Sequence, residues 1–277
     1  MTAAFVCPVC GAALKNEQNG LRCAKGHSFD LAKEGYVNLL LASRMRTKMP
    51  GDSKEMVAAR HRFLNGEGYK PFAEELARLC TQQAKQKKGP LHILDAGCGE
   101  GYYDSMIAAA LEEQGIAFEL VGFDISKAAV RLAAKRHIPN ASYAVASSFS
   151  IPVESGWADV ILNVFSPFAG EEFRRCLAKG GRLVYAVPTA QHLMGLKEVL
   201  YDTPYENSDA QVEYEGFKQA GQTQVEAQLV AEGQQVQDLF SMTPYYWKTP
   251  AEGSARLAQC SQLKTPIGFR FVLYDKI

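Results

Sequence analysis

The sequence predicts an α/β protein with a mostly parallel sheet, preceded by a small module that depends on a bound metal ion. From residue 91 onward, short apolar runs alternate with amphipathic stretches, which is typical of βαβ units. The first of these runs leads into a turn that contains Gly97, Gly99 and Gly101. Residues 1–40 have few large apolar side chains but contain paired cysteines, so we expect them to need a metal to fold.

The composition fits one large α/β domain with a small appendage. The chain has 277 residues, of which 47% are hydrophobic, so it is able to build a sizeable core. Thirty basic residues balance thirty acidic ones, and binding to nucleic acid would therefore depend on local clusters of charge. No apolar stretch approaches the length of a membrane span, and the N-terminus lacks the pattern of a signal peptide. We expect a cytoplasmic protein without membrane contact.

Three parts of the chain differ in pattern and predict three domains. Residues 1–40 form a zinc-binding module, residues 41–90 a helical, basic linking segment, and residues 91–277 the large domain. Within the linking segment, Asp-Ser-Lys-Glu at 52–55 resembles a capping box, which starts a helix. A second helix is expected over 71–84.

The large domain is predicted to contain seven strands and the helices between them. Strands are expected near residues 91–96, 118–124, 141–146, 158–164, 181–187, 222–231 and 267–274. Helices are expected near residues 102–114, 126–136, 170–178 and 190–201. This alternation places the glycine-rich turn at the carboxyl end of the first parallel strand.

Four residues of the first module have the types and the spacing of a zinc site. Cys7 and Cys10 are separated by two residues, Cys23 and His27 by three, and a hairpin turning at Asn19-Gly20 fits between the pairs. The alternatives are unrelated cysteines in a small core, or a redox pair at Cys7 and Cys10 without its usual βαβ surroundings. Four protein ligands close the coordination sphere, so we expect the Zn²⁺ to be structural.

The turn after the first strand of the large domain predicts a nucleoside cofactor. Asp95 ends the strand, and Gly97, Gly99 and Gly101 allow the backbone to approach a ligand closely. Asp124 ends the next strand, where a carboxylate accepts hydrogen bonds from both ribose hydroxyls. The alternative is a nicotinamide cofactor, but dinucleotide enzymes space their glycines GxGxxG and this chain has GxGxG.

These residues resemble the class I S-adenosylmethionine-dependent methyltransferases, which have a Rossmann-like, mostly parallel seven-stranded sheet. The resemblance implies that the glycine turn holds the methionine part of the cofactor and that Asp124 binds the ribose. Ser147, after the third strand, would lie beside the adenine. Asn163, at the end of the fourth strand, is also expected at the cofactor site, where it would orient the edge of the substrate.

Further motifs over nearly the whole chain resemble a narrower family, the bacterial large-subunit (23S) rRNA guanine-N1-methyltransferases. They are the zinc ligands, Lys-Glu-Gly-Tyr-Val-Asn-Leu-Leu at 33–40, Pro-Gly-Asp-Ser at 50–53, Gly-Glu-Gly-Tyr-Tyr at 99–103, His-Leu-Met at 192–194 and Met-Thr-Pro at 242–244. The resemblance implies S-adenosylmethionine, a structural zinc, an rRNA hairpin as substrate and a homodimer. It also implies that Tyr69, Gly99, Glu100 and His192 contact the cofactor. Asn-Val-Phe-Ser-Pro at 163–167 is not the Asn/Asp-Pro-Pro-Tyr box of amino-group methyltransferases, which agrees with a ring nitrogen as the target.

Basic residues of the linking segment form the densest positive cluster of the chain. They are Arg44, Arg46, Lys48, Arg60 and Arg62. Contacts with phosphates would fix the position of the RNA without reading its sequence. The alternative is that these side chains are only a solvated face.

The predicted reaction is an in-line displacement in which guanine N1 attacks the methyl group of S-adenosylmethionine. Because N1 carries a proton at neutral pH, an acceptor is required, and the sequence assigns none. Two other functions fit the same fold: a methyltransferase for small molecules, and a non-catalytic RNA-binding or assembly factor. The zinc module and the basic segment disfavour the first, and the complete set of cofactor residues disfavours the second.

Overall fold

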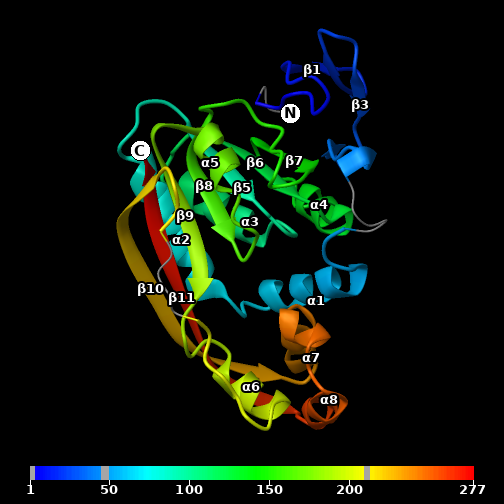
Figure 1. The fold of residues 1–277 in the computed structure, drawn as a ribbon, viewed down its shortest axis with the longest axis vertical. Coiled ribbons are helices and arrows are strands. Elements are labelled where there is room, and N and C mark those ends of the chain that lie inside the picture. Colours follow the sequence, from blue (N-terminus) through cyan, green and yellow to red (C-terminus); the bar gives the residue numbers. More distant parts are fainter. Residues whose placement is uncertain (1–3, 45–49, 209–212) are drawn as a thin grey trace.

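The predicted fold class is confirmed, with a large α/β domain and a small N-terminal module (Figure 1). The computed structural model describes residues 4–44, 50–208 and 213–277, and for Arg44 the backbone alone. The central strands β5 (Leu91–Ala96), β6 (Phe118–Asp124), β7 (Ala141–Val145) and β8 (Ala158–Val164) are parallel to their neighbours. They begin and end within one residue of the predicted bounds.

The sheet of the large domain has eight strands among the described residues, where seven were predicted. Its order is β10-β11-β9-β8-β5-β6-β7-β4. The additional strand is β4 (Val37–Asn38), which pairs in parallel with Ala144 and Val145 of β7. Two extended residues have no periodicity that a sequence pattern could detect. The end of the predicted zinc module therefore joins the sheet of the large domain.

The antiparallel edge of the sheet is longer than the sequence predicted. It consists of β9 (Leu177–Pro188), β10 (Phe217–Glu232) and β11 (Gln262–Lys276), with β10 outermost. β10 and β11 are joined by α7 (Gln234–Ser241), the short η2 (Pro244–Trp247) and α8 (Ala251–Ala258), for which no helix had been predicted.

The predicted helices are all present with shifted ends. They are α1 (Lys54–Asn65), α2 (Lys70–Ala84), α3 (Tyr102–Glu113), α4 (Lys127–Ala134), α5 (Gly170–Cys176) and α6 (Met194–Leu200). The N-cap of α1 is Ser53, whose hydroxyl accepts a hydrogen bond from the Met56 amide, and not Asp52, as a capping box ending at Glu55 would require. Among the described helices none is long and apolar enough to cross a membrane.

Buried side chains form one core on each face of the sheet. Ile93 belongs to the first core and the next residue, Leu94, to the second, because successive side chains of a strand point to opposite faces. Phe5, Leu14 and Leu21 of the small module belong to the second core. The module is thus packed against the large domain, and its Val6 amide donates a hydrogen bond to the carbonyl of Pro152 (3.0 Å).

The small module is a three-stranded antiparallel sheet of β1 (Leu14–Glu17), β2 (Gly20–Cys23) and β3 (Ser28–Asp30). Its first turn contains Gln18 and Asn19, one residue earlier than predicted, since Glu17 pairs with Gly20. A Cβ on Gly20 would lie 2.5 Å from the carbonyl oxygen of Phe29, so the glycine permits β3 to approach β2. Gly20 is therefore needed for the pairing of β2 with β3 and not for the turn.

Candidate functional site

The four predicted metal ligands lie together in the small module. Their ligand atoms are all within 4.8 Å of one another. His27 Nδ1 is 3.5 Å from Cys7 Sγ and 3.3 Å from Cys23 Sγ, and the sulfurs of Cys10 and Cys23 are 3.7 Å apart. A tetrahedral zinc with Zn–S bonds of about 2.3 Å separates its sulfurs by roughly 3.8 Å. These distances fit a zinc ion held through Nδ1 of His27 and three thiolates.

The backbone around the ligands favours thiolates. Gly11 directly follows Cys10 and Gly26 directly precedes His27, with φ of 71° and 87°, a region that favours glycine. Burial raises the pKa of Cys23, but hydrogen bonds from the amides of His27 and Lys25 outweigh this and lower its pKa to about 6. All four ligand positions are filled by the protein, so the site suits a structural ion.

The predicted cofactor turn lies where the order of the sheet reverses. From β5 the chain continues to β6 and β7 on one side, and then crosses to β8 on the other. In open α/β sheets, ligands bind outside the carboxyl ends of the strands at this switch point. Gly97–Gly101 follows β5 there, and Phe165–Pro167 follows β8.

The three glycines of the turn have different surroundings. A Cβ on Gly97 would lie 2.5 Å from Cβ of Ser166, and one on Gly101 would lie 3.0 Å from Ala133 of α4. At Gly99, φ is 55° and no atom lies within 4 Å of the position that a Cβ would take. Gly97 and Gly101 thus permit packing within the protein, whereas Gly99 faces open space and is the glycine that a ligand could approach.

Asp124 holds this turn in place. One carboxylate oxygen accepts the amide of Gly99 (3.1 Å) and the other accepts the amide of Ser126 (2.7 Å). Burial raises the pKa of this carboxyl, while the two amides act in the opposite direction. Each carboxylate oxygen has a second lone pair, so Asp124 is able to accept ribose hydroxyls in addition.

Asp95 is nearly fully buried at the end of β5. It lies beside the equally buried Asp104, which accepts the Tyr143 hydroxyl (3.1 Å). Burial and the charge of Asp104 raise the pKa of Asp95 well above its ordinary value. One of its carboxylate oxygens has no hydrogen-bond partner among the described residues, and its contact with the cofactor stays a prediction.

Glu100 lies in the turn and is nearly fully buried. Its Oε2 atom accepts hydrogen bonds from His61 (2.7 Å) and from the guanidinium of Arg136. Its Oε1 atom is buried without a hydrogen-bond partner among the described residues. A buried carboxylate oxygen without a partner fits a ligand that brings a charged donor, as the ammonium group of S-adenosylmethionine would.

Tyr69 and His192 contact each other at the same end of the sheet. The Tyr69 hydroxyl is 3.5 Å from Nε2 of His192, and the amide of Gly268 donates to its Nδ1 (3.2 Å). Burial, reinforced by Lys197, lowers the pKa of His192 to about 3. His192 is therefore neutral and carries its proton on Nε2. Since its one lone pair is already used, it is not available as a proton acceptor.

Asn163 lies near the end of β8. Its side chain is fully buried, and its Nδ2 donates to the Ser166 hydroxyl (2.6 Å), which in turn donates to the Ala96 carbonyl (2.6 Å). Asn163 therefore braces the loop after β8 against β5. Its Oδ1 is buried without a hydrogen-bond partner among the described residues, and its contact with a substrate stays a prediction. Ser147 is half-buried at the start of the loop after β7, as predicted, and its hydroxyl accepts the Phe149 amide (3.3 Å).

The basic cluster is only partly described. Arg46 and Lys48 lie outside the described residues, as does the side chain of Arg44. Arg60 donates to Asp52 and to the carbonyl of Met242, and Arg62 forms two hydrogen bonds with Asp238 (2.9 and 2.6 Å). Arg60 and Arg62 thus join α1 to the α7 region, and their contact with RNA phosphates stays a prediction.

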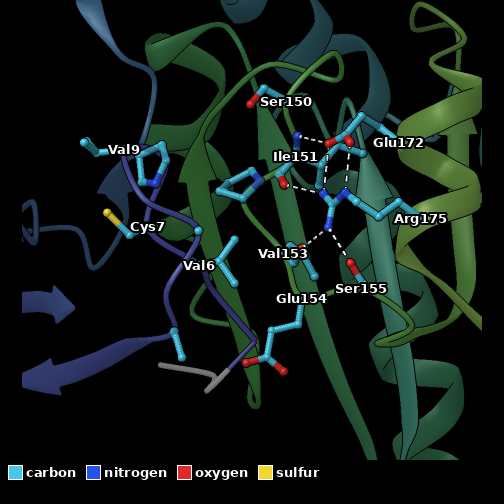
Figure 2. A pocket seen from close by; sticks show the side chains of 14 residues that line it. Val6, Cys7, Val9, Ser150, Ile151, Val153, Glu154, Ser155, Glu172 and Arg175 are labelled. Carbon is cyan, nitrogen blue, oxygen red and sulfur yellow. Dashed lines mark hydrogen bonds and ion pairs between the residues drawn. The ribbon is translucent and has the colours of Figure 1, made fainter. Parts of the chain in front are cut away.

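A groove of about 580 Å³ lies at the contact between the small module and the large domain, and both parts line it (Figure 2). The guanidinium of Arg175 is directed at the carbonyls of Ile151 and Val153 and at the carboxylate of Glu172. Glu154 adds a second negative charge to the lining. The groove is therefore unsuited to a polyanion, and its lining shares no residue with the turn at Gly97–Gly101.

Sequence reasoning missed Arg136 and His61 as partners of Glu100, and it missed Phe165. Arg136 and Glu100 are 36 residues apart, so no local pattern connects them. Phe165 is 49% exposed and has a φ of 51°, although it is not a glycine. The end of the apolar run after Phe165, at Ser-Pro (166–167), was the one signal that the sequence offered there.

Comparisons with known proteins agree with both parts of the site. Residues 5–48 match a zinc-ribbon family described as "RlmA, N-terminal", and residues 93–184 match the family described as "Methyltransferase domain". The chain is 36% identical to a putative 23S rRNA (guanine-N(1)-)-methyltransferase of Micromonospora griseorubida, over 92% of this chain and 91% of that protein. It is 36% identical to the 23S rRNA (guanine(748)-N(1))-methyltransferase of Streptomyces fradiae, over 91% of this chain and 89% of that protein. It is 32% identical to a putative 23S rRNA (guanine-N(1)-)-methyltransferase of Bacillus subtilis, over 90% of this chain and 88% of that protein.

Proposed function

The chain belongs to the family of 23S rRNA guanine-N1-methyltransferases, and from this premise we propose how its residues bind the two substrates. It is an S-adenosylmethionine-dependent enzyme with a structural zinc, and it methylates N1 of a guanine in rRNA. One observation carries the assignment of residues: Gly99 faces open space at the switch point, and its amide is fixed by Asp124.

We assign the cofactor to the side of the switch point between β5 and β6. Gly99 permits its close approach, Asp124 accepts the ribose hydroxyls, and the free Oε1 of Glu100 accepts the ammonium group. Ser147 lies at the end of β7, farther along the same side of the sheet, where it would border the adenine. Tyr69 and His192 close the site on the opposite side.

Bound S-adenosylmethionine supplies an activated methyl group with a good leaving group. The protein's contribution is therefore mainly to position the guanine and to exclude water. His192 keeps its proton on Nε2 and orients Tyr69, since the Gly268 amide occupies its other nitrogen. The proton on guanine N1 has to pass to an acceptor other than His192.

We place the contact with RNA phosphates at Arg44, Arg46 and Lys48. Arg60 and Arg62 are engaged in ion pairs, which leaves the N-terminal half of the cluster as the source of positive charge. The protein would act where ribosomal RNA is found, in the cytoplasm.

We further propose that the enzyme is a homodimer. β10 is the outermost strand of the sheet and is 16 residues long, and an edge of this length favours pairing with a second chain. Light scattering on the purified protein should give twice the mass of one chain (30.4 kDa). A monomer at micromolar concentration would contradict this part of the proposal.

Methyl transfer from labelled S-adenosylmethionine to a fragment of 23S rRNA tests the function directly. The parent enzyme should label the RNA fragment and leave a panel of small nucleophilic metabolites unlabelled. Gly99→Val should lose both cofactor binding and transfer, because a branched side chain would occupy the open space at Gly99. Gly180→Val, in the first part of β9 where its pairing with β8 is irregular, is the matched control, since it is also a glycine with positive φ and free space around it.

A further inference from the structure

Phe165 combines two features that rarely occur together. It is a large apolar residue with 49% of its surface exposed, and its backbone φ of 51° is a conformation that residues other than glycine rarely adopt. Strained residues of this kind persist where the surrounding structure holds them, and they cluster at functional sites. Here Asn163 and Ser166 hold the loop, through hydrogen bonds to each other and to Ala96.

The loop of Phe165 lies directly against the glycine turn. A Cβ on Gly97 would overlap Ser166, so the residue after Phe165 touches the turn that approaches the cofactor. Gly99 and Asp124 place the cofactor toward β5 and β6. Phe165 follows β8, on the other side of the switch point, which is the side left for the second substrate.

Aromatic side chains support the ring of Phe165 from behind. It lies nearly parallel to Phe72 (5.8 Å between ring centres, 18° between planes) and to His192 (6.4 Å, 27°). Phe269 packs against it at 5.6 Å. These contacts hold the ring in place, while about half of the residue's surface stays exposed next to the cofactor turn.

We propose that Phe165 is the surface on which the target guanine stacks when it is rotated out of the RNA hairpin. Enzymes that modify a base within a helix take it out of the stack and hold it by stacking and edge contacts. An aromatic ring accepts the face of any base, so this contact would position the guanine without selecting it. The inference rests on the proposed function, because it requires that the second substrate is a nucleobase.

The test compares Phe165→Tyr, which keeps the ring, with Phe165→Leu, which keeps an apolar side chain without one. Both variants have the same positive φ, so the backbone strain is matched. Under single-turnover conditions on the rRNA fragment, Phe165→Leu should be slower by about 5- to 150-fold, the range expected for one base stacked on an aromatic side chain. Phe165→Tyr should retain most of the parent rate. The melting temperature and the cofactor affinity should be equal in the two variants.

Each outcome has a distinct meaning. If the parent enzyme does not methylate RNA, the proposed function fails irrespective of Phe165. If the parent is active and Phe165→Leu is equally fast, Phe165 is not the stacking surface. If Phe165→Tyr is as slow as Phe165→Leu, the ring serves packing and the inference is overturned. Should the leucine variant not fold, Phe165→Met replaces it, and a parent-like rate there would equally overturn the inference.

Discussion

We expect cofactor affinity to depend most directly on Asp124, because its carboxylate would bind the ribose and also fixes the Gly99 amide. Asp124→Ala removes a charge-assisted pair of acceptors, and we expect cofactor binding to weaken by roughly 1.5–3 kcal/mol. Titration calorimetry with S-adenosylmethionine measures this. Asp275→Asn, which changes a half-exposed carboxylate at the end of β11, is the control and should bind like the parent. Parent-like binding by Asp124→Ala would place the ribose elsewhere.

The stability of the protein in acid tests whether His192 is neutral in the folded state. Its pKa is about 3 in the folded protein and about 6.5 when unfolded, so only the unfolded chain takes up this proton between these values. Its contribution to stability is complete above pH 6.5 and decreases as the pH falls toward 3. Between pH 6.5 and pH 4.5 the loss should be on the order of 2 kcal/mol.

Urea unfolding at these two pH values, for the parent and for His192→Gln, measures the His192 contribution as a difference. The variant should lose less stability than the parent on acidification, whereas His137→Gln, at an exposed position, should behave like the parent. An equal loss in the parent and in His192→Gln would show that His192 is protonated in the folded state.

Side chains whose role is set by local spacing were predictable, and those set by distant partners were not. The four metal ligands and Gly99 follow from short motifs, and the structure brings them to the expected places. Arg62 looked like a free cation because its partner Asp238 is 176 residues away. The hydrogen bonds of Asn163 to Ser166 and Ala96 were not predictable, because sequence does not show which way a side chain at a strand end turns.

Among the elements, the three-stranded module depends most on its metal. Its apolar contribution to the core is small, and structural zinc contributes on the order of 10 kcal/mol of apparent binding energy in such modules. Cys10→Ser should release zinc and make the module susceptible to protease, while the large domain keeps its cofactor affinity. Elemental analysis and limited proteolysis measure these outcomes. Cys260→Ser, at a half-buried cysteine outside the site, should retain the metal. Stoichiometric iron, or no metal in protein purified without chelator, would contradict the assignment.

Helices α1 and α7 are joined by the ion pair of Arg62 and Asp238. Asp238 is almost fully buried and Arg62 is half-exposed, so the loss of the pair leaves a buried charge with less compensation. Arg62→Gln should lower the free energy of unfolding by about 1 kcal/mol and leave the salt dependence of RNA binding unchanged.

Neutralising Arg44, Arg46 and Lys48 together should change RNA binding and not stability, the reverse of what is expected for Arg62→Gln. Stability should stay near that of the parent, while the slope of log affinity against log salt should fall by about 0.7–0.9 for each phosphate contact that is lost. RNA binding measured at several salt concentrations separates the two groups of basic residues. A slope that changes with Arg62→Gln, and not with the triple variant, would reverse the assignment.

Elements with a strong period were predicted well, and short or irregular ones were not. The bounds of β5, β6 and β8 agree with the apolar runs, because a buried parallel strand has few polar interruptions. β4 has two residues, and η2 exposes Tyr246 and Trp247, so neither has a regular apolar face. These segments are formed by tertiary contacts that no local window contains.

For the whole molecule, sheet order determines where the two substrates meet. The reversal between β5 and β8 brings Gly97–Gly101 and the loop of Phe165 side by side at one end of the sheet, although they are more than sixty residues apart in the sequence. The alternation of strands and helices predicted a parallel sheet, and the family resemblance supplied its cofactor. The eighth strand was not predictable, because it connects the zinc module to the sheet through two backbone pairs.

The central claim is that this chain methylates N1 of a guanine in 23S rRNA at the Gly99 site. The most direct measurement is nucleoside mass spectrometry and modification mapping of 23S rRNA from cells with and without the gene. Deletion should remove 1-methylguanosine at one position, the parent gene should restore it, and the Gly99→Val gene should not. An unchanged set of methylated guanines after deletion would contradict the account.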